Sequence, residues 1–110
     1  MQEIEPLALR QLIDAKTPLM LLDVRQPEEH AHVRLPDSTL IPVMELPERI
    51  AEIQALLAAS PAEVVVYCRS GQRSQLAIEY LSGQGIKGLK NLRGGINAYA
   101  KEADTSLSPY

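Results

Sequence analysis

The only cysteine of the chain lies in a short segment whose residue types favour a reactive thiolate. The segment, residues 67–74, reads YCRSGQRS and follows the β-branched run at 63–66. A thiol that ends a buried strand and precedes a helix faces backbone N–H groups that have no partner within that helix. Those N–H groups, the helix dipole and the guanidinium groups of Arg69 and Arg73 favour the charged form, so we expect the pKa of Cys68 to lie below its free value of about 8.5.

The rest of the segment predicts a cradle for an anion around that sulfur. Gly71 permits backbone conformations that are closed to other residues, and Ser70 and Ser74 add hydroxyl donors at short reach. We therefore predict that Cys68 is the catalytic nucleophile and that a small anionic substrate binds beside it. The predicted substrate-binding residues are Arg69, Ser70, Gly71, Gln72, Arg73 and Ser74.

The composition limits the domain count and the partners. With 110 residues, of which 45% are hydrophobic, the chain contains enough apolar material for one core and not for two. Its 14 acidic and 11 basic side chains are mixed along the sequence and give a formal charge of −3. Binding to nucleic acid or to an anionic membrane requires a basic stripe, so we expect neither partner.

Metal binding and membrane insertion are also disfavoured. One cysteine excludes an internal disulfide and a metal site built on paired cysteines, and His30 and His32 alone make a poor metal set. No window approaches the roughly 18 consecutive apolar residues of a membrane span, and residues 1–5 lack the layout of a signal peptide. We expect no metal, and we expect the protein in the cytoplasm.

Apolar runs and helical spacings alternate along the chain. Strands are predicted at 19–25, 39–43 and 63–67, with a weaker one at 87–92. Helices are predicted at 6–16, from 47 to about 60, after the cysteine segment as far as 83, and from 96 to about 103. Residues 26–38 are polar and are predicted to contain at most one helical turn.

This alternation requires crossover connections and predicts an α/β fold, with a mainly parallel sheet and helices on both faces. In such sheets ligands bind outside the carboxyl ends of the strands, where Cys68 lies. The prediction is one domain over residues 1–110, with 103–110 as a loosely held tail.

Two charged residues, Asp23 and Arg25, close the predicted strand at 19–25. They could act in catalysis, but a charge pair at the end of a buried strand more often braces neighbouring loops through hydrogen bonds. We therefore predict structural support for both. Met20 and Met44 are predicted to fill the core.

The cysteine segment resembles the active-site loop of rhodanese domains, and the resemblance extends over nearly the whole chain. Three other segments carry it in the family's order: 22–25 with 27–29, Ile41-Pro42 with Glu45-Leu46, and 91–96 with Ala98. Two positions depart from the family's pattern. Residues 33–38 read VRLPDS where GHIPGA is common, and Tyr99 replaces a frequent tryptophan.

The resemblance implies a single rhodanese-like domain with a mainly parallel five-stranded sheet, and it implies a persulfide relay. In that relay Cys68 takes sulfane sulfur from a donor such as thiosulfate and passes it to a nucleophilic acceptor such as cyanide or a thiol. No metal or organic cofactor is implied. Because the chain has no second cysteine to resolve the persulfide as an internal disulfide, the sulfur must leave to an external acceptor.

The end of the chain, residues 103–110, is similar to the tail of rhodanese domains fused behind adenylating, ubiquitin-activating-like enzymes. Those enzymes supply sulfur to small carrier proteins. The similarity implies a sulfur-carrier protein as an acceptor for the sulfur held on Cys68.

Two alternative functions remain at this point. Dual-specificity phosphatases of the cell-cycle type place five residues between a cysteine and an arginine, whereas four residues separate Cys68 from Arg73 here and Ser74 follows. The smaller ring of amides suits a single sulfur better than a tetrahedral phosphate. The other alternative is a non-enzymatic docking module for a sulfur-carrier pathway, and the intact cysteine loop argues against it.

Overall fold

The computed structural model describes residues 2–108, so Met1 and the last two residues of the predicted tail, Pro109 and Tyr110, lie outside the described residues. The elements follow one another as β1 (Glu3–Ile4), α1 (Pro6–Asp14), β2 (Leu19–Asp23), α2 (Pro27–His32), β3 (Thr39–Leu40), the 3₁₀ helix η1 (Val43–Glu48), α3 (Ile50–Leu57), β4 (Glu63–Tyr67), α4 (Gln72–Gly83), β5 (Leu89–Leu92) and α5 (Gly95–Glu102). Strands and helices alternate, as the sequence predicts.

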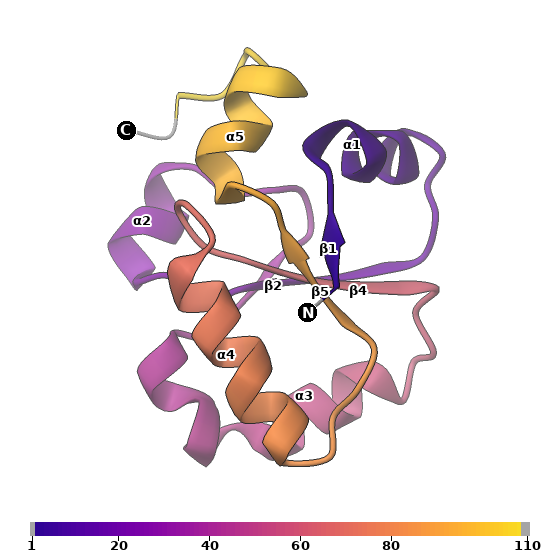
Figure 1. The fold of residues 1–110 in the computed structure, drawn as a ribbon, viewed down its shortest axis with the longest axis vertical. Coiled ribbons are helices and arrows are strands. Elements are labelled where there is room, and N and C mark those ends of the chain that lie inside the picture. Colours follow the sequence, from indigo (N-terminus) through magenta and orange to yellow (C-terminus); the bar gives the residue numbers. More distant parts are fainter. Residues whose placement is uncertain (1, 109–110) are drawn as a thin grey trace.

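The five strands form one sheet in the order β1-β5-β4-β2-β3, with parallel pairing throughout (Figure 1). The predicted five-stranded, mainly parallel sheet is thus confirmed. The central strand β4 pairs with β2 along its whole length, from Leu19 opposite Glu63 to Asp23 opposite Tyr67. The carboxyl ends of these two strands therefore lie side by side, and Cys68 follows directly on one of them.

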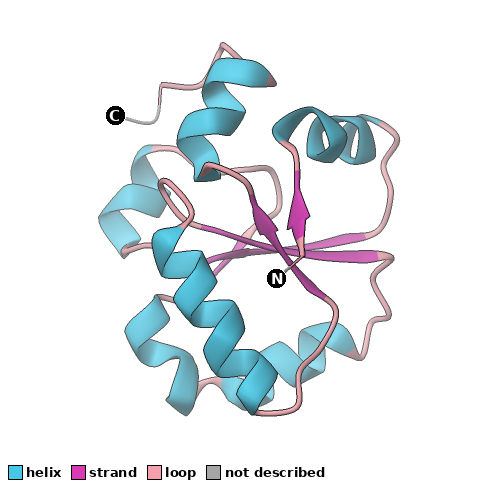
Figure 2. Ribbon diagram, in the orientation of Figure 1, coloured by secondary structure: helices cyan, strands magenta, loops and turns pink. Residues whose placement is uncertain are grey.

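Helices cover both faces of this sheet, with α1 and α5 on one side and α3 and α4 on the other (Figure 2). Successive side chains of a strand point to opposite faces, so β4 contributes to both layers. Val64 and Val66 belong to the apolar cluster on the side of α3 and α4, whereas Val65 and Tyr67 belong to the cluster on the side of α1 and α5. Burial of both faces explains why this strand is apolar at consecutive positions.

The polar segment 26–38 contains more helix than predicted. Helix α2 has six residues, which is longer than the single turn expected. Pro27 occupies its first turn, where a missing N–H costs nothing, and Gln26 and Glu29 form a reciprocal capping box. These end signals are sufficient to form a short helix that buries no residue.

The helix predicted from Pro47 is divided in the structure. Pro47 lies inside η1, and α3 begins only at Ile50, because Arg49 between them has φ −122° and ψ 21°, outside the helical region. Met44 lies on η1 and is 81% exposed, so its predicted place in the core is wrong. Met20 is buried in β2, as predicted.

The tail contacts the body of the domain as far as residue 108. The Arg10 guanidinium donates to the Ala103 carbonyl at 3.0 Å, and His32 Nε2 lies 2.9 Å from the carbonyl oxygen of Ser108. Leu107 packs against the apolar cluster on the side of α1 and α5. The looseness of this tail stays a prediction.

The longest helix within residues 2–108 is α4, with 12 residues. No helix of this range combines the length and the apolar character that crossing a membrane requires.

Candidate active site

Cys68 lies between the end of β4 and the start of α4, where the sequence places it, and only 1% of the residue is exposed. Its sulfur accepts hydrogen bonds from the Gly71 N–H at 3.1 Å and from the Ser74 N–H at 3.4 Å. The Ser74 hydroxyl oxygen lies 3.4 Å from the same sulfur. The backbone between Cys68 and Ser74 thus curls around one sulfur atom with amides directed at it.

The amino-terminal end of α5 holds the outer side of this loop. The Ile96 N–H donates to the Cys68 carbonyl at 2.9 Å, and the Asn97 N–H donates to the Arg69 carbonyl at 3.1 Å. The Arg69 carbonyl and the Ser70 N–H belong to one planar peptide unit, so anchoring the carbonyl on α5 turns that N–H to the opposite side, which is the side of the sulfur. So oriented, the Ser70 amide is among the groups that lower the pKa of the Cys68 thiol.

Two glycines make this arrangement possible. Gly71 precedes α4 with φ +107°, a left-handed conformation that other residues rarely adopt. Gly95 allows α5 to approach the loop, because a Cβ at this position would lie 2.6 Å from the Cys68 carbonyl oxygen. Both glycines therefore shape the cradle without contributing a side chain.

The surroundings of the sulfur lower its pKa. Burial of Cys68 raises the pKa of the thiol, but hydrogen bonds from the Ser74 hydroxyl, the Ser74 amide and the amides of Gly71 and Ser70 outweigh burial and bring the pKa below its ordinary value. The direction agrees with the sequence-based expectation. The largest causes that lower the pKa are the hydrogen bonds from Ser74, Gly71 and Ser70.

Asn91 of β5 is a part of the site that the sequence interpretation missed. Its side-chain Nδ2 donates to the Gly71 carbonyl at 3.1 Å, and its Oδ1 accepts from the Ser74 hydroxyl at 2.6 Å. The residue is buried, with 4% of its surface exposed. The signal in the sequence was a polar residue at the position where the strand shares a face with the apolar Leu89, two residues earlier.

The other predicted substrate-binding residues lie around the rim. Arg69, Ser70 and Gln72 are exposed. The guanidinium group of Arg73 instead contacts α2, where it donates to both oxygens of Glu29 at 2.7 and 2.9 Å. Substrate binding by Arg69, Ser70, Gly71, Gln72, Arg73 and Ser74 stays a prediction.

Asp23 and Arg25 form a fully buried ion pair at the end of β2. The guanidinium group donates to both Asp23 oxygens at 2.9 Å and to the Val33 carbonyl at 2.5 Å. His30 Nδ1 lies 2.8 Å from Asp23 Oδ2. The pair thereby connects β2 with α2 and with the chain that follows α2, a geometry suited to the predicted structural support.

Tyr67, the residue before the cysteine, continues this bracing on the same face of the sheet, because it pairs with Asp23 across β2 and β4. The Leu35 N–H donates to its hydroxyl oxygen at 3.2 Å, and the hydroxyl donates to Ser38 Oγ at 2.9 Å. Burial, and then the nearby Asp23 carboxylate, raise the pKa of Tyr67 to about 12. The phenol is therefore neutral at physiological pH and holds the 35–38 segment in place.

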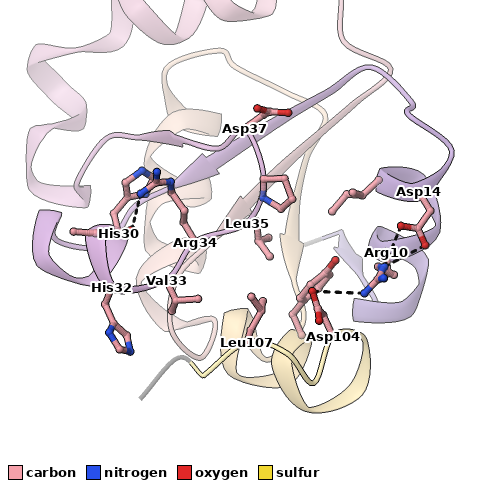
Figure 3. A pocket seen from close by; sticks show the side chains of 14 residues that line it. Arg10, Asp14, His30, His32, Val33, Arg34, Leu35, Asp37, Asp104 and Leu107 are labelled. Atoms are coloured by element: carbon pink, nitrogen blue, oxygen red, sulfur yellow. Dashed lines mark hydrogen bonds and ion pairs between the residues drawn. The ribbon is translucent and has the colours of Figure 1, made fainter.

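A pocket of about 680 Å³ lies on the side of α1 and α5, away from the cysteine loop (Figure 3). Its walls come from α1, from residues 30–37 and from the segment after α5. Arg10 bridges two of these walls, because it pairs with Asp14 on α1 and lies 3.6 Å from Asp104. Within residues 2–108, no group of three or more His, Cys, Asp or Glu side chains is arranged to hold a metal ion.

Comparison with known proteins places this geometry in a family. The family model described as the rhodanese-like domain matches residues 5–102. A sulfurtransferase of Allochromatium vinosum is 37% identical over 107 residues, which are 97% of this chain and 95% of that protein. The crystal structure of a rhodanese-related protein from Thermoplasma volcanium superposes with a TM-score of 0.76 at 30% identity and covers 94% of each chain.

The chain is also similar to part of a longer protein. The adenylyltransferase and sulfurtransferase MOCS3 of Arabidopsis thaliana is 30% identical over 112 aligned residues, which are 92% of this chain but only 24% of that protein. The similarity therefore concerns about a quarter of that relative.

Proposed function

Because the chain belongs to the rhodanese-like domain family, we propose that it is a sulfurtransferase in which Cys68 carries sulfane sulfur as a persulfide. The donor is a small anion such as thiosulfate, and the acceptor is an external thiol, cyanide or a sulfur-carrier protein. The family and its sulfurtransferase relatives support sulfur transfer in general. The donor, the acceptor and the role of each loop residue belong to this proposal.

One observation carries the proposal: Cys68 directly follows the central strand, and its sulfur accepts hydrogen bonds from the N–H groups of Gly71 at 3.1 Å and Ser74 at 3.4 Å. Such donors favour a thiolate, which is the form of cysteine that attacks. The same donors stabilise the negative charge of a sulfur atom bound to Cys68.

The first half of the reaction conserves charge without a cofactor. The Cys68 thiolate attacks the outer sulfur of thiosulfate, the Sγ–S bond forms, and the S–S bond of thiosulfate breaks. The bond electrons leave with sulfite as a dianion, and the persulfide carries the single negative charge on its terminal sulfur. In the second half, an acceptor nucleophile attacks that terminal sulfur and regenerates the thiolate.

The exposed Arg69 is proposed to attract the donor. Arg69→Gln should slow persulfide formation from dianionic thiosulfate about threefold to tenfold at low ionic strength, and leave alkylation of Cys68 by neutral iodoacetamide within about twofold. Arg34→Gln, an exposed arginine outside the loop, is the matched control. Equal effects of Arg69→Gln on both reagents would contradict steering of the anion.

The acceptor must come from outside the chain, because the sequence contains no second cysteine. We propose a sulfur-carrier protein or a protein thiol as this acceptor. The proposal is supported by the similarity to about a quarter of the plant adenylyltransferase and sulfurtransferase, and by the resemblance of the tail at 103–110.

Mass spectrometry of the intact protein tests the central step. Incubation with thiosulfate should add about 32 Da, one sulfur atom, and release one equivalent of sulfite. Cys68→Ser should abolish both. A folded wild-type protein that forms no adduct with thiosulfate or with a persulfide donor would exclude the relay and favour the non-enzymatic docking module.

A further inference from the structure

Asn91 is a buried polar residue beside the buried apolar side chains of one face of the sheet. It pairs with Val66 across β4 and β5, and paired residues of neighbouring strands point to the same side. That side is the layer of α3 and α4, which also contains Val66, Cys68 and Leu89. A buried amide in such a layer is unfavourable unless both of its ends are hydrogen bonded.

Both ends of this amide bind the cysteine loop. Nδ2 donates to the Gly71 carbonyl at 3.1 Å, and because a carbonyl can only accept, this contact fixes the orientation of the amide. Oδ1 must then face Ser74, whose hydroxyl lies 2.6 Å away. Since Oδ1 can only accept, the Ser74 hydroxyl is the donor in that contact.

The Ser74 hydroxyl therefore has two acceptors for one proton. Asn91 Oδ1 lies at 2.6 Å and Cys68 Sγ at 3.4 Å. While the hydroxyl donates to Asn91, it cannot donate to the sulfur, although a neutral thiol can donate to the serine oxygen. When the sulfur carries a charge, a hydrogen bond from the hydroxyl to the sulfur becomes the stronger of the two.

We propose that Asn91 is a positioning residue that holds the Ser74 hydroxyl proton whenever Cys68 Sγ is uncharged and yields it whenever Sγ is a thiolate. The use of this exchange in sulfur transfer rests on the proposed persulfide cycle, in which Sγ alternates between the two states. Sγ is charged before it attacks the donor. It is uncharged as the inner sulfur of the persulfide, whose charge is on the terminal sulfur.

This arrangement gives the buried hydroxyl an acceptor in both halves of the cycle. Asn91 also competes with the thiolate for this proton, because the Ser74 hydroxyl cannot donate to Asn91 Oδ1 and to the Cys68 sulfur at the same time. Without the Asn91 amide oxygen, the Ser74 hydroxyl can donate its proton to the Cys68 sulfur without this competition. Asn91→Leu should therefore favour the thiolate, although it also removes a brace from Gly71.

A double-mutant cycle separates competition from bracing. The pH dependence of Cys68 alkylation by iodoacetamide is measured in wild type, Asn91→Leu, Ser74→Ala and the double variant, with Arg69 and Arg73 unchanged in all four. If Asn91 competes with the thiolate, Asn91→Leu should lower the pH midpoint of alkylation by about 0.5–1 pH unit when Ser74 is present, which is a threefold to tenfold gain of thiolate. In the Ser74→Ala background, Asn91→Leu should not lower this midpoint.

A residue that only braces the loop gives a different result. Loss of the hydrogen bond from Asn91 to the Gly71 carbonyl would loosen the amide donors of the loop. The pH midpoint of alkylation would then rise both with Ser74 and with Ser74→Ala. A midpoint that is raised or unchanged with Ser74 present, or lowered equally in both backgrounds, would overturn the proposal. Asn91→Val, which is smaller and also lacks the acceptor, must give the same sign and replaces the leucine variant if that variant does not fold.

The readout does not depend on sulfur transfer. Alkylation needs no sulfur donor. If the wild-type protein forms no persulfide but the four alkylation midpoints differ as predicted, the proposed function is refuted and the exchange of the Ser74 proton between Asn91 and Cys68 is supported. A protein that forms the persulfide but shows no coupling between Asn91 and Ser74 would refute only the role of Asn91.

Discussion

Glu29 of α2 holds the guanidinium group of Arg73 on α4 through two hydrogen bonds, one to each carboxylate oxygen, at 2.7 and 2.9 Å. The same carboxylate accepts the Gln26 N–H at 2.9 Å, so it also caps its own helix. One side chain thus connects the start of α2 with the first turn of α4, next to the cysteine loop. Arg73 is held in a fixed geometry beside the site instead of moving freely in solvent.

Glu29→Gln tests the stability that this contact contributes. An amide cannot supply two charged acceptors, and the Arg73 side chain is 33% exposed, which limits the loss by solvation. We expect the free energy of unfolding to fall by about 1–2 kcal/mol, as measured by urea unfolding followed by circular dichroism. Glu28→Gln, an exposed neighbour on the same helix, should change it by less than about 0.5 kcal/mol. Equal losses in both variants would contradict the assignment.

Much of the fold was predictable because its causes are local. The run at 64–67 has no apolar and polar alternation, a pattern typical of a strand buried on both faces, so a central strand followed by Cys68 could be inferred from the residues alone. The two-residue strand β1 was not identified as a strand, because Glu3 and Ile4 are too few to show a period. Its pairing with β5 is a tertiary event. Met44 was placed in the core by residue type, whereas η1 turns it to solvent.

The residues of the cysteine loop could be predicted from the sequence, whereas the distant residues that hydrogen bond to the loop could not. The cysteine, the left-handed glycine Gly71 and Ser74 are adjacent in the sequence, so local rules place them together. Glu29 and Asn91 reach the loop from 44 and 17 residues away, measured to Arg73 and Ser74 respectively. Such contacts depend on how the helices and strands pack, which no local pattern specifies.

Asp23→Asn tests the structural support predicted for the buried pair with Arg25. Losing the charge of one partner leaves the other buried and uncompensated, so we expect a loss of about 3–5 kcal/mol in urea unfolding. Asp37→Asn is the control, because Asp37 is exposed and its left-handed backbone, φ +56°, suits asparagine equally well.

A second measurement on Asp23→Asn separates support from catalysis. If the pair only supports the loops, persulfide formation per folded molecule should stay within about threefold of wild type under conditions where the variant is folded. A loss of more than about a hundredfold in the folded variant would assign Asp23 a part in the chemistry.

Gly95→Ala should damage the frame behind the loop. The new Cβ would lie 2.6 Å from the Cys68 carbonyl oxygen, and the position has φ +65°, so steric contact adds to backbone strain. We expect a loss of about 3 kcal/mol or more. Gly88→Ala is a matched control, since Gly88 has φ +78° but no atom within 4 Å of the new Cβ, and it should cost only about 1 kcal/mol. Similar losses in thermal unfolding of both variants would show that the contact with the loop is not decisive.

The lowered pKa of Cys68 predicts how stability depends on pH. Hydrogen bonds from Ser74, Gly71 and Ser70 outweigh burial and hold the folded-state pKa below its ordinary value, while the unfolded chain has a pKa of about 8.5. Between these two values the unfolded state binds more protons, so stability rises with pH. The contribution is complete above the unfolded value and is lost as the pH falls through the folded value.

Cys68→Ser isolates this contribution, because serine has a similar size and does not titrate in this range, while all other groups are shared. We expect the difference in unfolding free energy, wild type minus Cys68→Ser, to increase as the pH rises from about 6 to about 9 under reducing conditions. Urea unfolding at a series of pH values measures it. A difference that decreases with pH would mean that burial prevails over the hydrogen bonds and that the folded thiol is a poorer acid than a free one.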